Sequence, residues 1–283
     1  LTGCLESGSA LILSKEPIDL HGRSVHEILF VAPRNPAQET WTGRRLGPDG
    51  AMNVLHMEAA LPIDSLEPVL ARLLPSMRTF YDASKVHKHG ERAAATASPV
   101  FTDTTLTRLF RERATALAPQ REITRALSAL REIKTPEELA LMRRTIAISN
   151  DAHNRVIHEA RPGWHEYELQ ALAEYTFTKN GAEYDAYPCI VGSGPNSTIL
   201  HYETNRRQTR DGEFIEMDMG AEYHGYSADI TRSFPINGTF TTEQKAIYEL
   251  VLAAQDSGIK ACVTGAPFRA AHQAAVRVIT SGL

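Results

Sequence analysis

The sequence predicts two domains of different class, a small α/β domain followed by an α+β domain. In the first part, short runs of aliphatic residues alternate with helical patterns. In the second part, two helical patterns come first, strand patterns run from Gly181 to Pro235, and two further helical patterns follow. A well-marked helix start at Thr135 separates the parts, so we expect the domains at residues 1–132 and 133–283.

The α/β domain opens with two strand patterns, Ala10 to Leu13 and Glu27 to Ala32, joined by a loop that contains glycine. Asp64 and Glu67 have the spacing of a capping box and are expected to open a helix. The apolar face of this helix would consist of Leu66, Val69, Leu70 and Leu73.

The rest of this domain is less regular. Residues 77–81 form a further strand pattern and residues 106–117 a further helical pattern, with a polar surface loop at 85–98 between them. His87 and His89 in this loop have strand-like spacing, which is far more typical of a solvated pair than of a metal site.

The α+β domain begins with a capping box, in which Thr135 is the N-cap, Pro136 the first helical residue and Glu138 its partner. The apolar stripe of this helix is Leu139, Met142, Ile146, Val156 and Ile157. A second helix is expected to run to about Asn180, with Gly181 ending it. Its inward residues would be Leu169, Leu172, Ala173 and Phe177.

Two more helices follow the strand region. Thr241 and Gln244 form another capping box, which predicts a third helix. Its inward residues would be Ile247, Leu250, Val251 and Ala254, and a fourth helix is expected over residues 268–281.

The composition of the chain argues against two classes of binding partner. A net charge of −4 argues against nucleic acid or an anionic membrane as the main partner, since both usually attract a basic surface. Apolar runs stay well short of the roughly 18–20 residues that a membrane span needs. Cys4, Cys189 and Cys262 are far apart and odd in number, which indicates a reducing compartment, so we expect a cytoplasmic protein.

Asp218 and Asp229 lie in two strand patterns separated by a glycine-containing turn at 223–225. If the strands form a hairpin centred between Tyr223 and His224, the two aspartates are cross-strand partners on one face, about 4.5–5.5 Å apart at Cβ. Carboxylates that close repel each other, and a divalent cation removes the conflict. A carboxylate pair can hold two metal ions, whose chemistry is metal-assisted hydrolysis. The alternative is a pair of ordinary aspartates beside a turn, solvated or paired with an arginine such as Arg232.

His201 is expected at the end of a short apolar strand that follows a glycine-rich turn. There it could hydrogen-bond a substrate carbonyl group or stabilise a charged intermediate. The alternative is a half-buried histidine whose hydrogen bonds are satisfied within the fold.

Several long stretches, in the same order, resemble the aminopeptidase P (Xaa-Pro aminopeptidase) branch of the pita-bread metallopeptidases. In the second domain these are "RPGWHEYEL", "IVGSGPNSTILHYETN" and "RDGEFIEMDMGAEYHGYSADITRSFPINGTFT". In the first part and at the domain entry they are "LTGCLESGSALIL", "ILFVAPRNPAQETWTGRRLGPDGA" and "KTPEELALMRR". The resemblance covers nearly all of the chain and implies a creatinase-like α/β N-terminal domain followed by an α+β pita-bread catalytic domain.

The resemblance also implies the reaction and the residues. The reaction is release of the N-terminal residue from peptides with proline second, with a hydroxide held between two metal ions, typically Mn²⁺. Asp218 would be a terminal ligand, Asp229 a bridging ligand, and His201 a catalytic residue that contacts substrate. Trp41 would line the substrate site of a neighbouring subunit in a homo-oligomer, or, equally, it is a packed aromatic residue of the small domain.

Two departures from the family pattern affect the expectations. The family completes its metal site with one histidine and two glutamates from segments further along, so we expect this chain to be a fragment at both ends with little peptidase activity by itself. Glu216 stands where the family usually has an aliphatic residue, and strand alternation places it on the same face as Asp218.

Two alternative functions stay open. A prolidase-type dipeptidase would use the same metal pair, although "WTGRRLG" around Trp41 favours the aminopeptidase. A non-catalytic module that binds peptides or proteins is the other, but such a module has no reason to keep a repelling pair of carboxylates.

Overall fold

The computed structural model describes residues 2–4, 6, 8–73, 75 and 121–283. It divides into two compact units, Leu1–Ile133 and Lys134–Leu283. The elements predicted at 77–81, 85–98 and 106–117, with His87 and His89, lie outside the described residues.

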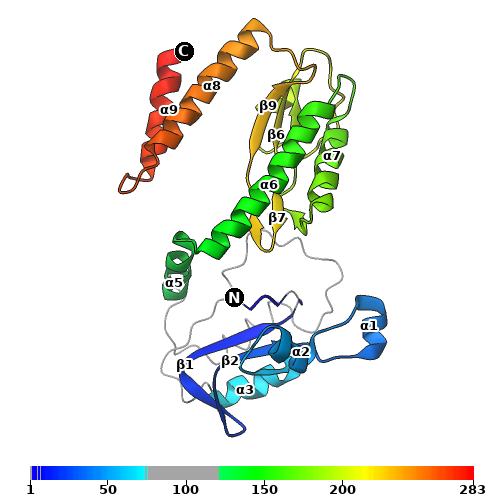
Figure 1. Ribbon diagram of the computed structural model, residues 1–283, viewed down its shortest axis with the longest axis vertical. Coiled ribbons are helices and arrows are strands. Elements are labelled where there is room, and N and C mark those ends of the chain that lie inside the picture. Colours follow the sequence, from blue (N-terminus) through cyan, green and yellow to red (C-terminus); the bar gives the residue numbers. More distant parts are fainter. Residues whose placement is uncertain (1, 5, 7, 74, 76–120) are drawn as a thin grey trace. The chain divides into compact units, whose positions relative to one another are not determined.

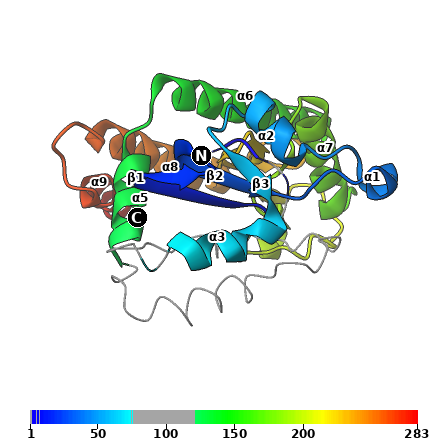
Figure 2. The same ribbon diagram turned by 90° about the horizontal axis from the view of Figure 1, so that it is seen from below.

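The N-terminal unit is built on a three-stranded sheet of order β1-β2-β3 (Figure 2). The strands are β1 (Ala10–Leu20), β2 (Arg23–Val31) and β3 (Ala60–Pro62). β1 and β2 are antiparallel, and their turn places His21 and Gly22 at φ 53° and 80°, the positive values that a tight hairpin needs. Both predicted strands are confirmed, and each extends further toward this turn.

Alternation along β2 gives this sheet two apolar faces. Ile28 and Phe30 pack in a cluster with Leu66 and Leu70 of α3 (Leu66–Leu73). Residues of the opposite face, Leu29 and Val31, pack with Ala51 of α2 (Gly47–Val54). The sheet therefore lies between α2 and α3, as Figure 2 shows.

The predicted capping box at Asp64 and Glu67 is wrong, although the buried face of the helix is confirmed. The chain first forms a 3₁₀ turn, η1 (Ile63–Ser65), and α3 follows without a break. The residue before the turn is Pro62, which has no side-chain acceptor for a cap. Two further helices belong to this unit, α1 (Pro36–Thr42) and α5 (Arg121–Glu132).

The C-terminal unit begins with two helices whose predicted ends are confirmed. They are α6 (Pro136–Glu159) and α7 (Glu166–Lys179). The Thr135 hydroxyl accepts from the Glu138 N–H at 3.2 Å, and the Glu138 carboxylate accepts from the Thr135 N–H at 2.7 Å. The predicted inward residues of α7 are buried or partly buried in the core, and Gly181 follows the helix at φ 94°.

The predicted apolar stripe of α6 is largely wrong. Val156 is buried, but Leu139, Ile146 and Ile157 are exposed. The buried face includes instead polar residues that bond to strand backbone: Thr145 donates to the Tyr226 carbonyl group, Ser149 accepts from the Ala221 N–H, and His153 bonds the Met219 carbonyl group. These polar groups can be buried because each one meets a hydrogen-bonding partner on the hairpin.

The strand region forms two small sheets that share one long hairpin. One sheet has the order β5-β6-β9 and the other β4-β7-β8. The strands are β4 (Tyr184–Asp185), β5 (Ile190–Ser193), β6 (Phe214–Asp218), β7 (Ala221–Tyr223), β8 (Tyr226–Ser227) and β9 (Thr231–Pro235). Ile215 and Met217 of β6 are fully buried in one core cluster with residues of α6 and α7. Figure 1 shows these two helices along the same face of the strands, so Glu216 and Asp218 point to the opposite face.

The unit ends in a pair of helices, α8 (Thr242–Ala261) and α9 (Arg269–Gly282), which pack against each other (Figure 1). The capping box of Thr241 and Gln244 is confirmed. The predicted burial of Ile247 and Val251 is wrong, since both are more than half exposed. Small residues such as Ala254 and Ala274 are the buried ones in this pair, which leaves the large side chains outside. In the described parts of the chain, no helix is at once long and apolar enough to cross a bilayer.

Candidate metal centre

The hairpin that carries the two aspartates turns at His224 and Gly225, where φ is 50° and 78°. Tyr223 pairs with Tyr226, and the same register pairs Asp218 with Thr231. The prediction that Asp218 and Asp229 are directly opposed is therefore wrong. A two-residue turn of this kind needs positive φ at both central residues, and the glycine at its second position fixes the turn one residue later than predicted.

Asp229 lies across from Gly220 instead. The Met219 N–H donates to the Ile230 carbonyl group at 3.2 Å, and the Ala228 N–H donates to the Ala221 carbonyl group at 3.0 Å. Gly220 lies between β6 and β7, and Asp229 lies between β8 and β9, outside the regular strands. The two aspartates are therefore two positions apart in register, a spacing that long or bridging groups still reach.

Tyr187 shows that the two carboxyl groups converge. Its hydroxyl oxygen is 2.5 Å from Asp218 Oδ1 and 3.3 Å from Asp229 Oδ1. Burial, followed by the hydrogen bond to Asp218, raises the pKa of Tyr187 above its ordinary value, so the phenol stays protonated and donates. A single proton cannot satisfy two carboxylates, and the shorter distance assigns it to Asp218.

Sequence reasoning missed Tyr187. It lies in the loop before β5, and β5 pairs with β6 so that Ile190 is the partner of Asp218. Nothing about an isolated tyrosine before Pro188 marks it as a site residue. The sequence signal that could have found Tyr187 is the strand pattern that follows it, because that strand pairs with the strand of Asp218.

No basic side chain neutralises the pair in the described parts of the chain, because no ion pair there includes Asp218 or Asp229. Arg232, the partner considered from the sequence, donates instead to the Thr231 carbonyl group at 2.8 Å. Two converging carboxylates without a positive partner are a destabilising arrangement that a divalent cation would relieve.

Glu216 adds a third carboxyl group to this face. Its Oε2 atom is buried and forms no hydrogen bond with any described residue. Burial, and then the charge of Asp218, raises the pKa of Glu216 to about 7. An all-oxygen donor set with a buried, unpaired carboxyl oxygen fits hard or borderline divalent ions, so the residues present suit a metal centre.

The raised pKa of Glu216 predicts a pH-dependent stability in metal-free protein. The folded state holds this proton more tightly than the unfolded chain, so stability falls as pH rises from 4.5, the ordinary value, to about 7. Because the side chain is only half-buried, we expect a loss on the order of 1–2 kcal/mol relative to Glu216→Gln. Urea unfolding of both proteins between about pH 4 and pH 8 measures it. A difference that does not vary with pH would contradict the prediction, and Glu203→Gln is the exposed control.

His201 does not emerge from a strand, so that expectation is wrong. Gly194, at φ 52°, starts a 3₁₀ turn, η3 (Gly194–Thr198), and a further turn carries His201. The side chain is exposed, which excludes the half-buried alternative, and it has no hydrogen bond or ion pair with any described residue. Among the described residues, no contact joins His201 to Asp218 or Asp229, and the catalytic role of His201 remains a prediction.

Trp41 lies on α1 of the N-terminal unit with 89% of its surface exposed. Among the described residues, the alternative of a packed aromatic residue is therefore wrong. No contact among the described residues tests the substrate-site role of Trp41, which stays a prediction.

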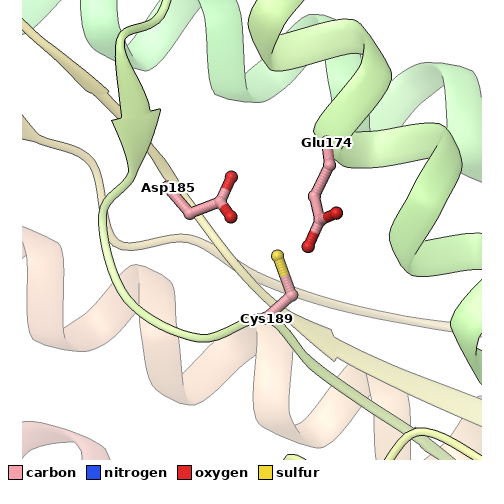
Figure 3. Close-up of side chains that lie close together, drawn as sticks. All are labelled: Glu174, Asp185 and Cys189. Atoms are coloured by element: carbon pink, nitrogen blue, oxygen red, sulfur yellow. The ribbon is translucent and has the colours of Figure 1, made fainter. Parts of the chain in front are cut away.

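A second group of potential ligands was not anticipated from the sequence. Glu174 of α7, Asp185 of β4 and Cys189 before β5 point toward one another, as Figure 3 shows, with their ligand atoms all within 4.8 Å. Carboxylate and thiolate ligands together suit zinc. Glu174 also accepts from the Gln170 amide at 2.7 Å, and no second feature of the described residues points to an ion at this group.

Comparison with known protein families gives the class of protein. The model of metallopeptidase family M24 matches residues 140–283, the part that carries the converging carboxylates. The model of the aminopeptidase P N-terminal domain matches residues 1–81. The fold and the site thus define a metallopeptidase in which an N-terminal domain of the aminopeptidase P type is followed in the sequence by a pita-bread domain.

Individual relatives agree with this class. Xaa-Pro aminopeptidase of Escherichia coli is 36% identical over all of this chain, which covers 62% of that protein. The structure of proline aminopeptidase P II from Yersinia pestis matches the whole chain with a TM-score of 0.82 and 35% identity, over 63% of its own length. Xaa-Pro dipeptidase of Homo sapiens is 40% identical, but over 52% of this chain and 31% of its own length.

The chain belongs to metallopeptidase family M24, as a member of the aminopeptidase P family. It spans about three fifths of the length of the Escherichia coli relative.

Proposed function

We propose that the whole protein is a metal-dependent aminopeptidase that releases the N-terminal residue from peptides with proline in second position. The observation that carries this proposal is the convergence of Asp218 and Asp229 on the hydroxyl oxygen of Tyr187. The name of the Escherichia coli relative, Xaa-Pro aminopeptidase, supports the substrate class.

Asp218 and Asp229 are the residues that would hold two divalent ions. When bound, such ions supply an activated water molecule at neutral pH and polarise the peptide carbonyl group. Tyr187 would keep the Asp218 carboxylate in place by donating a hydrogen bond to it. The carboxylate oxygens of Asp218, Asp229 and Glu216 suit Mn²⁺, which we propose as the metal.

His201 and Trp41 are proposed to bind the substrate. His201 would donate a hydrogen bond to the peptide near the bond that is cleaved, which its exposed position leaves it free to do. Trp41 would cover the substrate of another subunit in a homo-oligomer, and its 89% exposure supports a role outside its own unit. Location in the cytoplasm is also proposed, because Cys4, Cys189 and Cys262 form no disulfide in the described parts of the chain.

A prolidase-type dipeptidase is the second candidate, supported by the similarity to the human Xaa-Pro dipeptidase over half of the chain. The match of residues 1–81 to the aminopeptidase P N-terminal domain favours the aminopeptidase. A non-catalytic binding module is disfavoured by the retained pair Asp218 and Asp229, which repel each other without a metal.

The experiment uses the full-length protein loaded with Mn²⁺ and three peptides. They are a tripeptide with proline second, a matched tripeptide with alanine second, and a dipeptide that ends in proline. We expect the first to be cleaved at least about 100-fold faster than the second. Preferred cleavage of the dipeptide would favour the prolidase, and no cleavage with the metal bound would favour the binding module.

A further inference from the structure

Glu166, the first residue of α7, is a carboxylate with no exposed surface. Its Oε1 atom accepts from the Ser193 N–H at 2.8 Å, the Ser193 hydroxyl at 2.7 Å and the Asn196 amide at 3.1 Å. Its Oε2 atom accepts from the Tyr202 hydroxyl at 2.8 Å and the Arg207 N–H at 3.0 Å. All five donors belong to one segment, residues 193–207, which carries His201.

These donors stabilise the negatively charged form of Glu166. Burial would raise its pKa, but the hydrogen bonds from Ser193, Arg207, Tyr202 and Asn196 outweigh burial and lower it. Its position at the start of α7 adds the favourable end of the helix dipole. The guanidinium group of Arg207 forms an ion pair with Glu213 and donates to the Ser193 hydroxyl oxygen at 2.8 Å. A neutral residue at this position would leave buried donors without an acceptor.

A second anchor holds the same segment after His201. Asn205 is 1% exposed and adopts a positive φ of 47°. Its side-chain oxygen accepts from the Val191 N–H at 3.1 Å, and its amide donates to the Cys189 carbonyl group at 2.8 Å and to Gln170 at 2.9 Å. The segment is therefore fixed on both sides of His201, at Asn196 and from Tyr202 onward.

We infer that Glu166 is a positioning residue: its buried carboxylate fixes the 193–207 segment and so places His201 for the reaction. His201 has no bonded partner of its own among the described residues, so its place depends on these anchors. The inference rests on the proposed function, because it gives His201 a substrate to contact. A misplacement of about 1 Å in a catalytic group can cost on the order of 100-fold in rate.

The test compares Glu166→Gln with Glu168→Gln in the full-length, metal-loaded protein. Glu168 is on the same turn of α7 but exposed, and it bonds only to His165 in the described parts of the chain. We expect Glu166→Gln to lower kcat/KM by about 10- to 100-fold, mainly through kcat, with metal content unchanged. The control should stay within about twofold of the wild type.

A double variant separates positioning from loss of stability. If Glu166 acts through His201, then Glu166→Gln combined with His201→Ala should be no slower than His201→Ala alone. Multiplied losses would overturn the inference. Should Glu166→Gln fail to fold, Tyr202→Phe removes one of the five donors and should show a smaller loss with the same coupling to His201.

Hydrogen exchange gives a readout that does not depend on activity. Residues 194–206 should exchange faster in Glu166→Gln than in Glu168→Gln, while β6 stays protected. Unchanged exchange in this segment would contradict the inference. A wild-type protein that binds metal but cleaves no peptide would sink the proposed function instead, and exchange alone would then decide whether Glu166 fixes the segment.

Discussion

Asp218→Asn is expected to lower kcat/KM of the full-length, metal-loaded protein by at least about 10³-fold, and Asp229→Asn by as much or more. Each substitution removes one of two charged ligands that face the same hydroxyl group of Tyr187. An amide carries no negative charge, so the remaining ligands no longer balance two divalent ions. Metal content per chain, measured by mass spectrometry on dialysed protein, should fall in parallel with activity.

In the metal-free state, the same two variants provide a second check, because they are expected to lose no stability although they lose activity. Without a cation, Asp218 and Asp229 repel each other, so removal of either charge should leave the free energy of unfolding unchanged or increase it. The increase in Tm that Mn²⁺ gives the wild type should be lost in both variants. Asp256→Asn on the exposed face of α8 is the matched control and should keep both activity and the metal-dependent Tm. A full metal response in Asp218→Asn would refute the metal centre.

Gly220→Ala is expected to lower the free energy of unfolding by about 3 kcal/mol and to weaken metal binding. A Cβ atom on Gly220 would collide with the carbonyl oxygen of Ala228, which precedes Asp229 in the segment between β8 and β9. Relief of the collision must push the two strands of the hairpin apart, and Asp218 and Asp229 would separate with them.

Gly225→Ala is the matched control on the same hairpin. Gly225 has a φ of 78° and open space around its Cβ position, so alanine there costs only the strain of a left-handed backbone, about 1 kcal/mol. Urea unfolding of both variants, with metal binding measured beside it, checks the comparison. Equal losses at the two positions would show that the close approach at Gly220 is not what holds the carboxylates together.

Local signals in the sequence were sufficient for most of the helices. The capping boxes at Thr135 and Thr241 involve residues within one turn, so their geometry follows from neighbouring residues alone. The capping box predicted at Asp64 failed because Pro62 starts a 3₁₀ turn before it. Buried faces were less predictable: α6 buries Thr145 and Ser149 against strand backbone, which no hydrophobic pattern reveals.

For the site, sequence reasoning found the carboxylates and their shared face but not their register. The turn lies one residue later than predicted, so the residue opposite Asp218 is Thr231 and not Asp229. Tyr187 and Glu166 were missed because their contacts join segments about 30 residues or more apart, as in the bond from Tyr187 to Asp218. Such contacts leave no mark in the spacing of residues along the chain.

By itself, the sequence determined the helices α6, α7, α8 and α9, the family resemblance and the identity of the acidic residues, because those depend on nearby residues and on residue type. Only the tertiary structure decided which strands pair in which register, that a tyrosine joins the two aspartates, and that a buried glutamate holds the segment of His201. The physical reason is that hydrogen bonds and charges act between atoms that are close in space, and folding alone brings these side chains together.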